Sequence, residues 1–262
     1  MTRIEKKFAA LKEAHKKGLF IYLMAGVPDV KGTIEAVKMA ERAGADVIEL
    51  GLPFSDPLAD GPVIQEAGIR ALRGGMTLAG VLALVKELRS FTDIPLSGMG
   101  YINNVLHYGV EKFVADAKAA GLDGAILPDV PHEESAELRA VCGAKDFRLI
   151  EFVTPGTTPD RLARTCGSAN GFIYAVSVNG VTGEQKIDYS VIGKVAREVR
   201  RHTEVPLAVG FGIGSPEAAV DAARDADAVI VGSAVVRRLM DGKTQEAEDF
   251  IASLRRALDA AY

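Results

Sequence analysis

The sequence predicts an α/β fold in which eight parallel strands alternate with helices and close into a barrel. Short β-branched runs alternate with longer stretches whose apolar residues recur every three or four positions. Eight such units in 262 residues match the size of a TIM barrel. A doubly wound open sheet is the alternative, but the glycine fingerprint expected after its first strand is absent. Because no Pro-rich or Ser-rich linker divides the chain, we expect one domain over residues 1–262.

Each predicted strand is a short run rich in apolar residues. The eight runs span residues 20–24, 47–51, 95–100, 124–127, 148–153, 172–177, 206–210 and 228–232. Clear helical patterns lie between them, for example at residues 33–45, 110–122, 190–202 and 215–226. Gly44 and Gly121 stand at the ends of two of these patterns, which predicts left-handed caps there.

The two ends of the chain are predicted to be helices of the scaffold. Residues 1–17 form an extra N-terminal helix with Ile4, Phe8 and Leu11 on one face, which we expect to cover the bottom of the barrel. Residues 245–261 form the last helix, whose apolar residues lie at core spacing.

Composition and charge exclude several classes of function. A net charge of -4 and a pI near 5.7 give no basic face, so neither nucleic acid nor an acidic membrane is an expected partner. The N-terminus lacks a secretory pattern, and no segment approaches the roughly 18 to 20 apolar residues that span a bilayer. Cys142 and Cys166 have no metal-like spacing, and the four histidines are scattered. We therefore expect a cytoplasmic protein without a metal site.

The stretch DVIELGLPFSDPLADGPVIQ, residues 46–65, carries two candidate catalytic carboxylates. Glu49 interrupts the apolar run of the second strand, and Asp60 lies in the following loop, where strand ends form the active site of such barrels. Strand alternation places Glu49 on the face of Val47 and Gly51, so it reaches the barrel mouth if that face points inward. A buried ion pair is the alternative role for Glu49, and an ordinary turn the alternative for Asp60.

A phosphate site is predicted after the seventh and eighth strands. GFGIGSPEAA, from Gly210, includes Ser215 as a helix N-cap and Pro216 at the first helical position. VIVGSAVV places Gly232 and Ser233 before the next helix. Free N–H groups at helix starts bind dianions, and phosphate sites recur at these two loops of the fold.

Two further features leave alternatives open. Residues 176–188, with Gly180 and Gly183, form either a mobile lid or a plain surface loop. Apolar and aromatic residues near strand ends could flank a flat ligand or belong to the core; these are Tyr22, Tyr101, Leu127, Phe152 and Tyr174.

The motifs of the chain resemble those of the tryptophan synthase α subunit family over essentially the whole length. They are GADVIELGLPFSDPLADGPVIQ, DGAILPDVPHEES, GFIYAVSVNGVTG, GFGI and VGSAVV, in this order. The first is highly specific, whereas the last two are shared with many phosphate-binding barrels. The resemblance implies retro-aldol cleavage of indole-3-glycerol phosphate to indole and glyceraldehyde 3-phosphate. It also implies an αββα assembly with a β subunit that carries pyridoxal phosphate and receives the indole, and no cofactor in this chain.

The resemblance assigns roles to individual residues. Glu49 would protonate indole C3 and help to deprotonate the glyceryl hydroxyl, and Asp60 would stabilise charge at the indole nitrogen. Thr182 would close a lid against Asp60. The remaining assignments are phosphate binding by Gly183, Gly212, Gly232 and Ser233, an indole pocket of Tyr22, Tyr101, Leu127 and Tyr174, and β-subunit contacts by Pro53, Asp56 and Leu58 in the 53–58 loop. Partner docking on that loop is expected to position Asp60.

Four positions depart from the family pattern, and they surround the pocket and its rim. Val27 replaces a usual Asp, Asn104 a common Pro and Asn179 a frequent Thr, and Gly156 is added. Partner dependence therefore stays open. The alternatives are a stand-alone indole-releasing lyase, a non-catalytic barrel that binds phosphorylated ligands and regulates a neighbour, and a sugar-phosphate isomerase of the same fold, which would leave the SDPLADGP loop unexplained.

Overall fold

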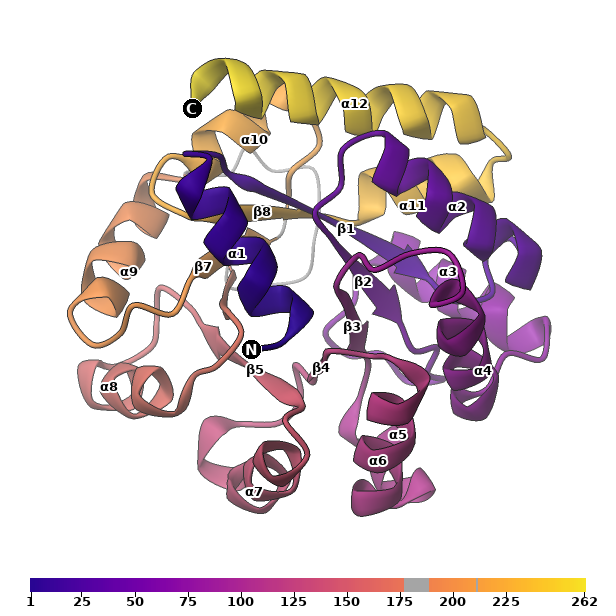
Figure 1. Cartoon of the computed structure of the whole chain (residues 1–262), viewed down its shortest axis with the longest axis horizontal. Helices are drawn as coiled ribbons and strands as arrows, with labels where there is room; N and C mark the ends of the chain where they lie inside the picture. The colour runs from indigo at the N-terminus through magenta and orange to yellow at the C-terminus, as the bar shows by residue number, and fades with distance from the viewer. Residues whose placement is uncertain (177–188, 211) are drawn as a thin grey trace.

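A computed structural model describes residues 1–176, 189–210 and 212–262, and its strands form a closed parallel barrel (Figure 1). The strands follow one another around the barrel in sequence order, and β8 pairs with β1 through Gly18 and Ala228. They are β1 (Gly18–Met24), β2 (Val47–Gly51), β3 (Leu96–Met99), β4 (Gly124–Ile126), β5 (Arg148–Val153), β6 (Ile173–Val176), β7 (Leu207–Gly210) and β8 (Ala228–Val231). The predicted TIM barrel is confirmed, with small differences at the strand ends; residue 177 of the predicted sixth strand lies outside the described residues.

Helices surround the barrel, and several connections carry two of them. They are α1 (Arg3–Glu13), α2 (Val30–Arg42), α3 (Pro62–Arg73), α4 (Leu78–Leu88), α5 (Ile102–Tyr108), α6 (Val110–Ala120), the 3₁₀ turn η1 (His132–Glu134), α7 (Ala136–Ala144), α8 (Pro159–Ser168), α9 (Ser190–Arg200), α10 (Pro216–Ala223), α11 (Ser233–Met240) and α12 (Thr244–Ala261). Gly121 caps α6 in the left-handed region, and Gly44 has a φ of 102° just after α2, as predicted.

The N-terminal helix closes one end of the barrel, as the sequence predicts. In Figure 1, α1 lies in front of the strands. The Phe8 ring lies 5.5 Å from that of Phe20 in β1 and 6.2 Å from that of Phe172, which precedes β6. Ile4 and Phe8 belong to the same buried cluster as the interior residues of the strands. This packing leaves the opposite end, where the strands finish, as the open one.

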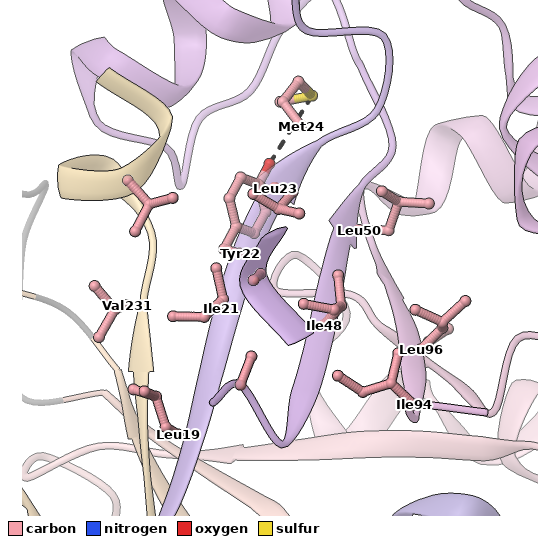
Figure 2. Close-up of a cluster of buried hydrophobic side chains, with 14 of the residues drawn as sticks. Leu19, Ile21, Tyr22, Leu23, Met24, Ile48, Leu50, Ile94, Leu96 and Val231 are labelled. Atoms are coloured by element: carbon pink, nitrogen blue, oxygen red, sulfur yellow. Dashed lines mark hydrogen bonds between the residues drawn. The ribbon is translucent and has the colours of Figure 1, made fainter. Parts of the chain in front are cut away.

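Alternation along the strands separates the barrel interior from the layer beneath the helices. Figure 2 shows one part of that outer layer, where Leu19, Ile21 and Leu23 of β1 lie beside Ile48 and Leu50 of β2. The intervening residues of both strands point inward; Phe20 and Val47, for example, join the cluster that α1 covers. Glu49 therefore lies on the inward face, as the alternation predicts.

Three aspartates hold the end of the barrel at which strands begin. Each directly precedes an even-numbered strand, and its carboxylate accepts a hydrogen bond from a backbone N–H of the preceding strand. The bonds join Asp46 to Leu19, Asp123 to Leu96 and Asp227 to Leu207, over 3.0, 2.9 and 2.7 Å. Each aspartate also pairs with an arginine; the partners are Arg255, Arg89 and Arg200. These carboxylates satisfy N–H groups at the strand starts and fix neighbouring strands in register.

Candidate active site

A cavity of about 700 Å³ occupies the open end of the barrel. Strand ends, the loop before α3 and the first turn of α11 form its wall. The lining residues central to the chemistry are Tyr22, Glu49, Asp60, Tyr174, Gly212, Gly232 and Ser233. Seven residues assigned separately from the sequence thus face one cavity, whose volume lies in the range of small-molecule sites.

Glu49 lies at the bottom of the cavity as a buried carboxyl group. On β2 it stands between Tyr22 of β1 and Ser97 of β3, and its side chain is fully buried. Among the described residues neither carboxyl oxygen has a hydrogen-bond partner, and no ion pair includes Glu49. The ion-pair role considered for Glu49 therefore finds no support. Burial raises the pKa of Glu49 from 4.5 to about 8, so the group holds its proton at neutral pH.

Asp60 lines the same cavity from the loop between β2 and α3. Burial raises its pKa from 3.8 to about 6, although a hydrogen bond from the Tyr101 hydroxyl opposes that rise. The turn uses the backbone groups of Asp60 and not its carboxylate. The Asp60 N–H donates to the Pro57 carbonyl over 3.2 Å, and the Asp60 carbonyl accepts from the side-chain Nε2 of Gln65 over 2.9 Å. The carboxylate is therefore not needed to make the turn and is mostly ionised at neutral pH.

Two tyrosines form walls beside Glu49, and each needs a glycine opposite it. A Cβ atom at Gly51 would lie 2.1 Å from the Tyr22 hydroxyl oxygen, and one at Gly210 would lie 2.3 Å from that of Tyr174. Tyr174 also stacks on Phe152, with ring centroids 5.0 Å apart. The strand-end glycines thus make room for aromatic walls.

Two helix starts flank the glycine-rich side of the cavity. Ser215 caps α10 by accepting the N–H of Ala218 over 3.2 Å, with Pro216 at the first helical position, as predicted. Ser233 and Ala234 open α11, where N–H groups have no acceptor inside the helix. Because both residues line the cavity with Gly212 and Gly232, this side suits an anion.

Other predicted site residues lie elsewhere. Leu127 and Tyr101 are buried but do not line the cavity: Leu127 belongs to the layer beneath the helices, and Tyr101 lies behind Asp60. Pro53 is buried, whereas Asp56 and Leu58 are exposed at the tip of their loop. The predictions for Thr182, Gly183 and Asn179, and most of the 176–188 loop, lie outside the described residues.

The cavity also includes residues that the sequence reasoning missed. Residues 61–64 at the start of α3 line it, as do Arg237, Arg238 and Lys243 near its outer rim. Helical spacing could have found the arginines, because residues four and five positions after Ser233 lie one turn along α11. Asp241 and Glu246 also line this part of the cavity, and Glu246 pairs with Lys243 over 3.3 Å, so charges of both signs lie there.

Within the described ranges, no group of three His, Cys, Asp or Glu side chains could hold a metal ion. No single helix in these ranges is long and apolar enough to cross a membrane; only α3 and α4 together, bent by 94°, pass that test.

Comparison with known proteins identifies the family of the chain. A family model described as tryptophan synthase alpha chain matches residues 8–261. The tryptophan synthase subunit alpha of Legionella pneumophila is 35% identical with a TM-score of 0.92, and the match covers 99% of both chains. A protein of Aquifex aeolicus is 38% identical with a TM-score of 0.92, covering 98% of this chain and 99% of that one.

A structure of tryptophan synthase from Mycobacterium tuberculosis in an aminoacrylate-bound form is also similar. Its matched chain is 33% identical with a TM-score of 0.89, and the match covers 98% of this chain and all of that one. The family match over nearly the whole sequence and these full-length likenesses place the chain in the tryptophan synthase alpha chain family.

Proposed function

We propose that this chain cleaves indole-3-glycerol phosphate between Glu49 and Asp60, as the carbon–carbon lyase of tryptophan biosynthesis that its family membership indicates. The observation that carries the assignment of the site is the separation of two carboxyl groups in one cavity. Glu49, with a pKa of about 8, holds a proton at neutral pH, whereas Asp60, with a pKa of about 6, is mostly ionised. One acid and one base are thus available at the same pH.

In the first step, protonated Glu49 transfers its proton to C3 of the indole ring. The ring then carries positive charge at its nitrogen, and the Asp60 carboxylate stabilises that charge. Glu49 is left as a carboxylate with no cation beside it among the described residues, so it is a strong base in this position.

In the second step, the Glu49 carboxylate removes the proton of the glyceryl hydroxyl next to the ring. The hydroxyl carbon becomes the aldehyde of glyceraldehyde 3-phosphate, and the carbon–carbon bond to C3 breaks. Its electron pair returns to the ring, which becomes neutral indole, and Glu49 recovers its proton. The cycle needs no external acid or base.

The rest of the cavity fits the two ends of this substrate. We assign the phosphate to Gly212, Gly232 and Ser233, because the first N–H groups of α11 lie there. We assign the indole ring to the aromatic walls of Tyr22 and Tyr174.

We further propose that the enzyme works with a β subunit that carries pyridoxal phosphate, in an αββα assembly in the cytoplasm. Asp56 and the 90% exposed Leu58 stand at the tip of the 53–58 loop, where an apolar contact to a partner would be buried. The free thiols of Cys142 and Cys166 fit a reducing compartment.

Indole release from indole-3-glycerol phosphate, measured with and without a tryptophan synthase β subunit, tests this function. We expect slow release by the chain alone and faster release with the partner. Full activity alone would favour a stand-alone lyase. Ligand-dependent protection without indole release would favour a regulatory barrel.

A further inference from the structure

The loop that carries Asp60 contacts the rest of the chain at its base and is exposed at its tip. Residues 53, 54, 59 and 60 touch the segment that ends β3 and begins α5, whereas Ser55, Asp56 and Leu58 are exposed. The base is therefore held by contacts within this chain, whereas the tip is open to solvent.

Tyr101 holds the base through three contacts. Its ring stacks on Phe54 with centroids 5.2 Å apart and an interplanar angle of 24°. Its hydroxyl oxygen accepts the N–H of Ala59 over 3.0 Å, and the hydroxyl also interacts with the Asp60 carboxylate and lowers its pKa. One phenol thus fixes the backbone before Asp60 and acts on the carboxylate.

Asn104 holds the other side of the base. Its Nδ2 donates to the carbonyl oxygen of Pro53 over 3.1 Å, from the first turn of α5. A residue without a side-chain N–H group at this position could not make this hydrogen bond. This tether is therefore a feature that the side chain of Asn104 adds.

The support for Tyr101 extends to the next strand. Gly100 N–H donates to the Ile126 carbonyl over 3.0 Å, and the Ile102 N–H donates to both carboxylate oxygens of Asp129 over 3.1 Å. The residues on either side of Tyr101 are thus bound to β4 and the loop after it, so Tyr101 is itself attached to the barrel.

We propose that Tyr101 and Asn104 are positioning residues that fix Asp60 at the cavity within this chain, before any partner docks on the loop tip. The inference rests on the proposed function, because it matters to catalysis only if Asp60 serves the reaction. It limits the partner's influence on this loop to residues 55–58, in contrast to the expectation that partner docking positions Asp60.

Tyr101→Phe is the sharpest variant, because it removes the hydroxyl and keeps the ring on Phe54. In the chain without partner, we expect kcat for indole release to fall about 10- to 100-fold, as small misplacements of a reacting group do. The KM should change little, because Tyr101 does not line the cavity.

The pH profile separates positioning from a merely structural role. Activity requires ionised Asp60 and should fall as the pH drops through about 6. Besides Tyr101, the titratable groups that act on or face Asp60 are Tyr22 and Tyr174, with Glu49 in the same cavity. All of them stay in Tyr101→Phe, so loss of the lowering hydrogen bond should move the acidic limb to higher pH.

Asn104→Ala and Asn103→Ala form a matched pair on α5. Asn104→Ala should lower kcat a few-fold without moving the acidic limb, because Asn104 contacts Pro53 rather than the carboxylate. Asn103 is exposed and should be replaceable without effect. Equal activities of the two variants would remove Asn104 from the proposal.

Amide hydrogen exchange at Ala59 in the partner-free chain gives a readout that does not need activity. It should accelerate by up to about tenfold in Tyr101→Phe, as expected for the loss of one net hydrogen bond. Unchanged exchange, or faster exchange with kcat and acidic limb unchanged, would overturn the positioning role. A wild-type chain that releases no indole even with a β subunit would instead overturn the proposed function, while exchange at Ala59 would still show whether Tyr101 holds the loop.

Discussion

The carboxylates at the two ends of the barrel differ in their hydrogen-bond and ion-pair partners. At the end where strands begin, Asp46, Asp123 and Asp227 each accept a backbone N–H and pair with an arginine. At the end where strands finish, neither oxygen of Glu49 has a partner among the described residues, and Asp60 has a tyrosine hydroxyl instead of a cation.

The difference shows how a barrel separates stability from chemistry. A buried carboxylate that is paired and hydrogen-bonded stays charged and holds strands together. One without partners has a raised pKa and can exchange a proton with a ligand. The first kind precedes strands at the closed end and the second faces the cavity at the open end, and in both places the neighbouring groups decide the role of the carboxylate.

The largest expected effect is on catalysis at Glu49. Glu49→Gln keeps the shape of the side chain and removes its proton exchange, so kcat for indole release should fall by about 10² to 10⁴ or more. Steady-state kinetics at pH 7 with a β subunit present measures this. Turnover at the wild-type rate would end the assignment of Glu49.

At the other end of the barrel, the largest effect should be on stability. Asp123→Asn leaves Arg89 without its charged partner, where the two side chains are only 10% and 3% exposed. We expect a loss of about 3 kcal/mol in the free energy of unfolding, measured with urea, and no change in kcat of the folded enzyme.

Asp93→Asn is the matched control for Asp123→Asn. Like Asp123, Asp93 pairs with an arginine, in this case Arg3. Its side chain is 95% exposed, so its replacement should change the free energy of unfolding by less than about 1 kcal/mol. Equal losses in the two variants would contradict the role given to burial.

Glu49 should also make stability depend on pH in a direction opposite to that of a paired acid. Its folded pKa is above its ordinary value of 4.5, so folding favours the protonated form. Burial of Glu49 does not lower the free energy of unfolding below about pH 4.5, where the group is protonated in both states. As the pH rises from about 4.5 toward about 8, the free energy of unfolding falls, by about 3 kcal/mol at pH 7.

Urea unfolding of wild type and Glu49→Gln between pH 5 and pH 8 tests this cost. The advantage of the variant should grow with pH across that range. Glu87→Gln, at an exposed position, should show no such trend. A constant difference between Glu49→Gln and wild type would mean that Glu49 does not change its proton affinity on folding.

The effect of Asp60→Asn on catalysis is expected to be smaller than that of Glu49→Gln, because a neutral amide still presents an oxygen toward the indole nitrogen. We expect kcat to fall by roughly 10²-fold, the size of a lost electrostatic contact in an active site. An unchanged rate would leave Asp60 as a loop residue only.

Local sequence signals predicted the parts of the site that depend on strand position. Residue alternation placed Glu49 on the inward face, and capping chemistry placed Ser215 and the start of α10. The residues themselves left Leu127 and Tyr101 open between ligand contact and core, and the resemblance assigned both to the indole pocket. In this structure neither lines the cavity. Which face of a buried residue meets the cavity depends on packing that no local pattern encodes.

The sequence by itself determined the barrel, its closing helix and the two carboxylates at one mouth, because strand period, helix period and glycine positions are local properties of the chain. Only the tertiary structure decided which carboxylates find partners. The raised pKa of Glu49, the arginines at the opposite end, and the contacts of Tyr101 and Asn104 with the Asp60 loop all join residues distant in sequence. Burial and hydrogen bonding arise from those long-range contacts, and they set the charge on which the chemistry depends.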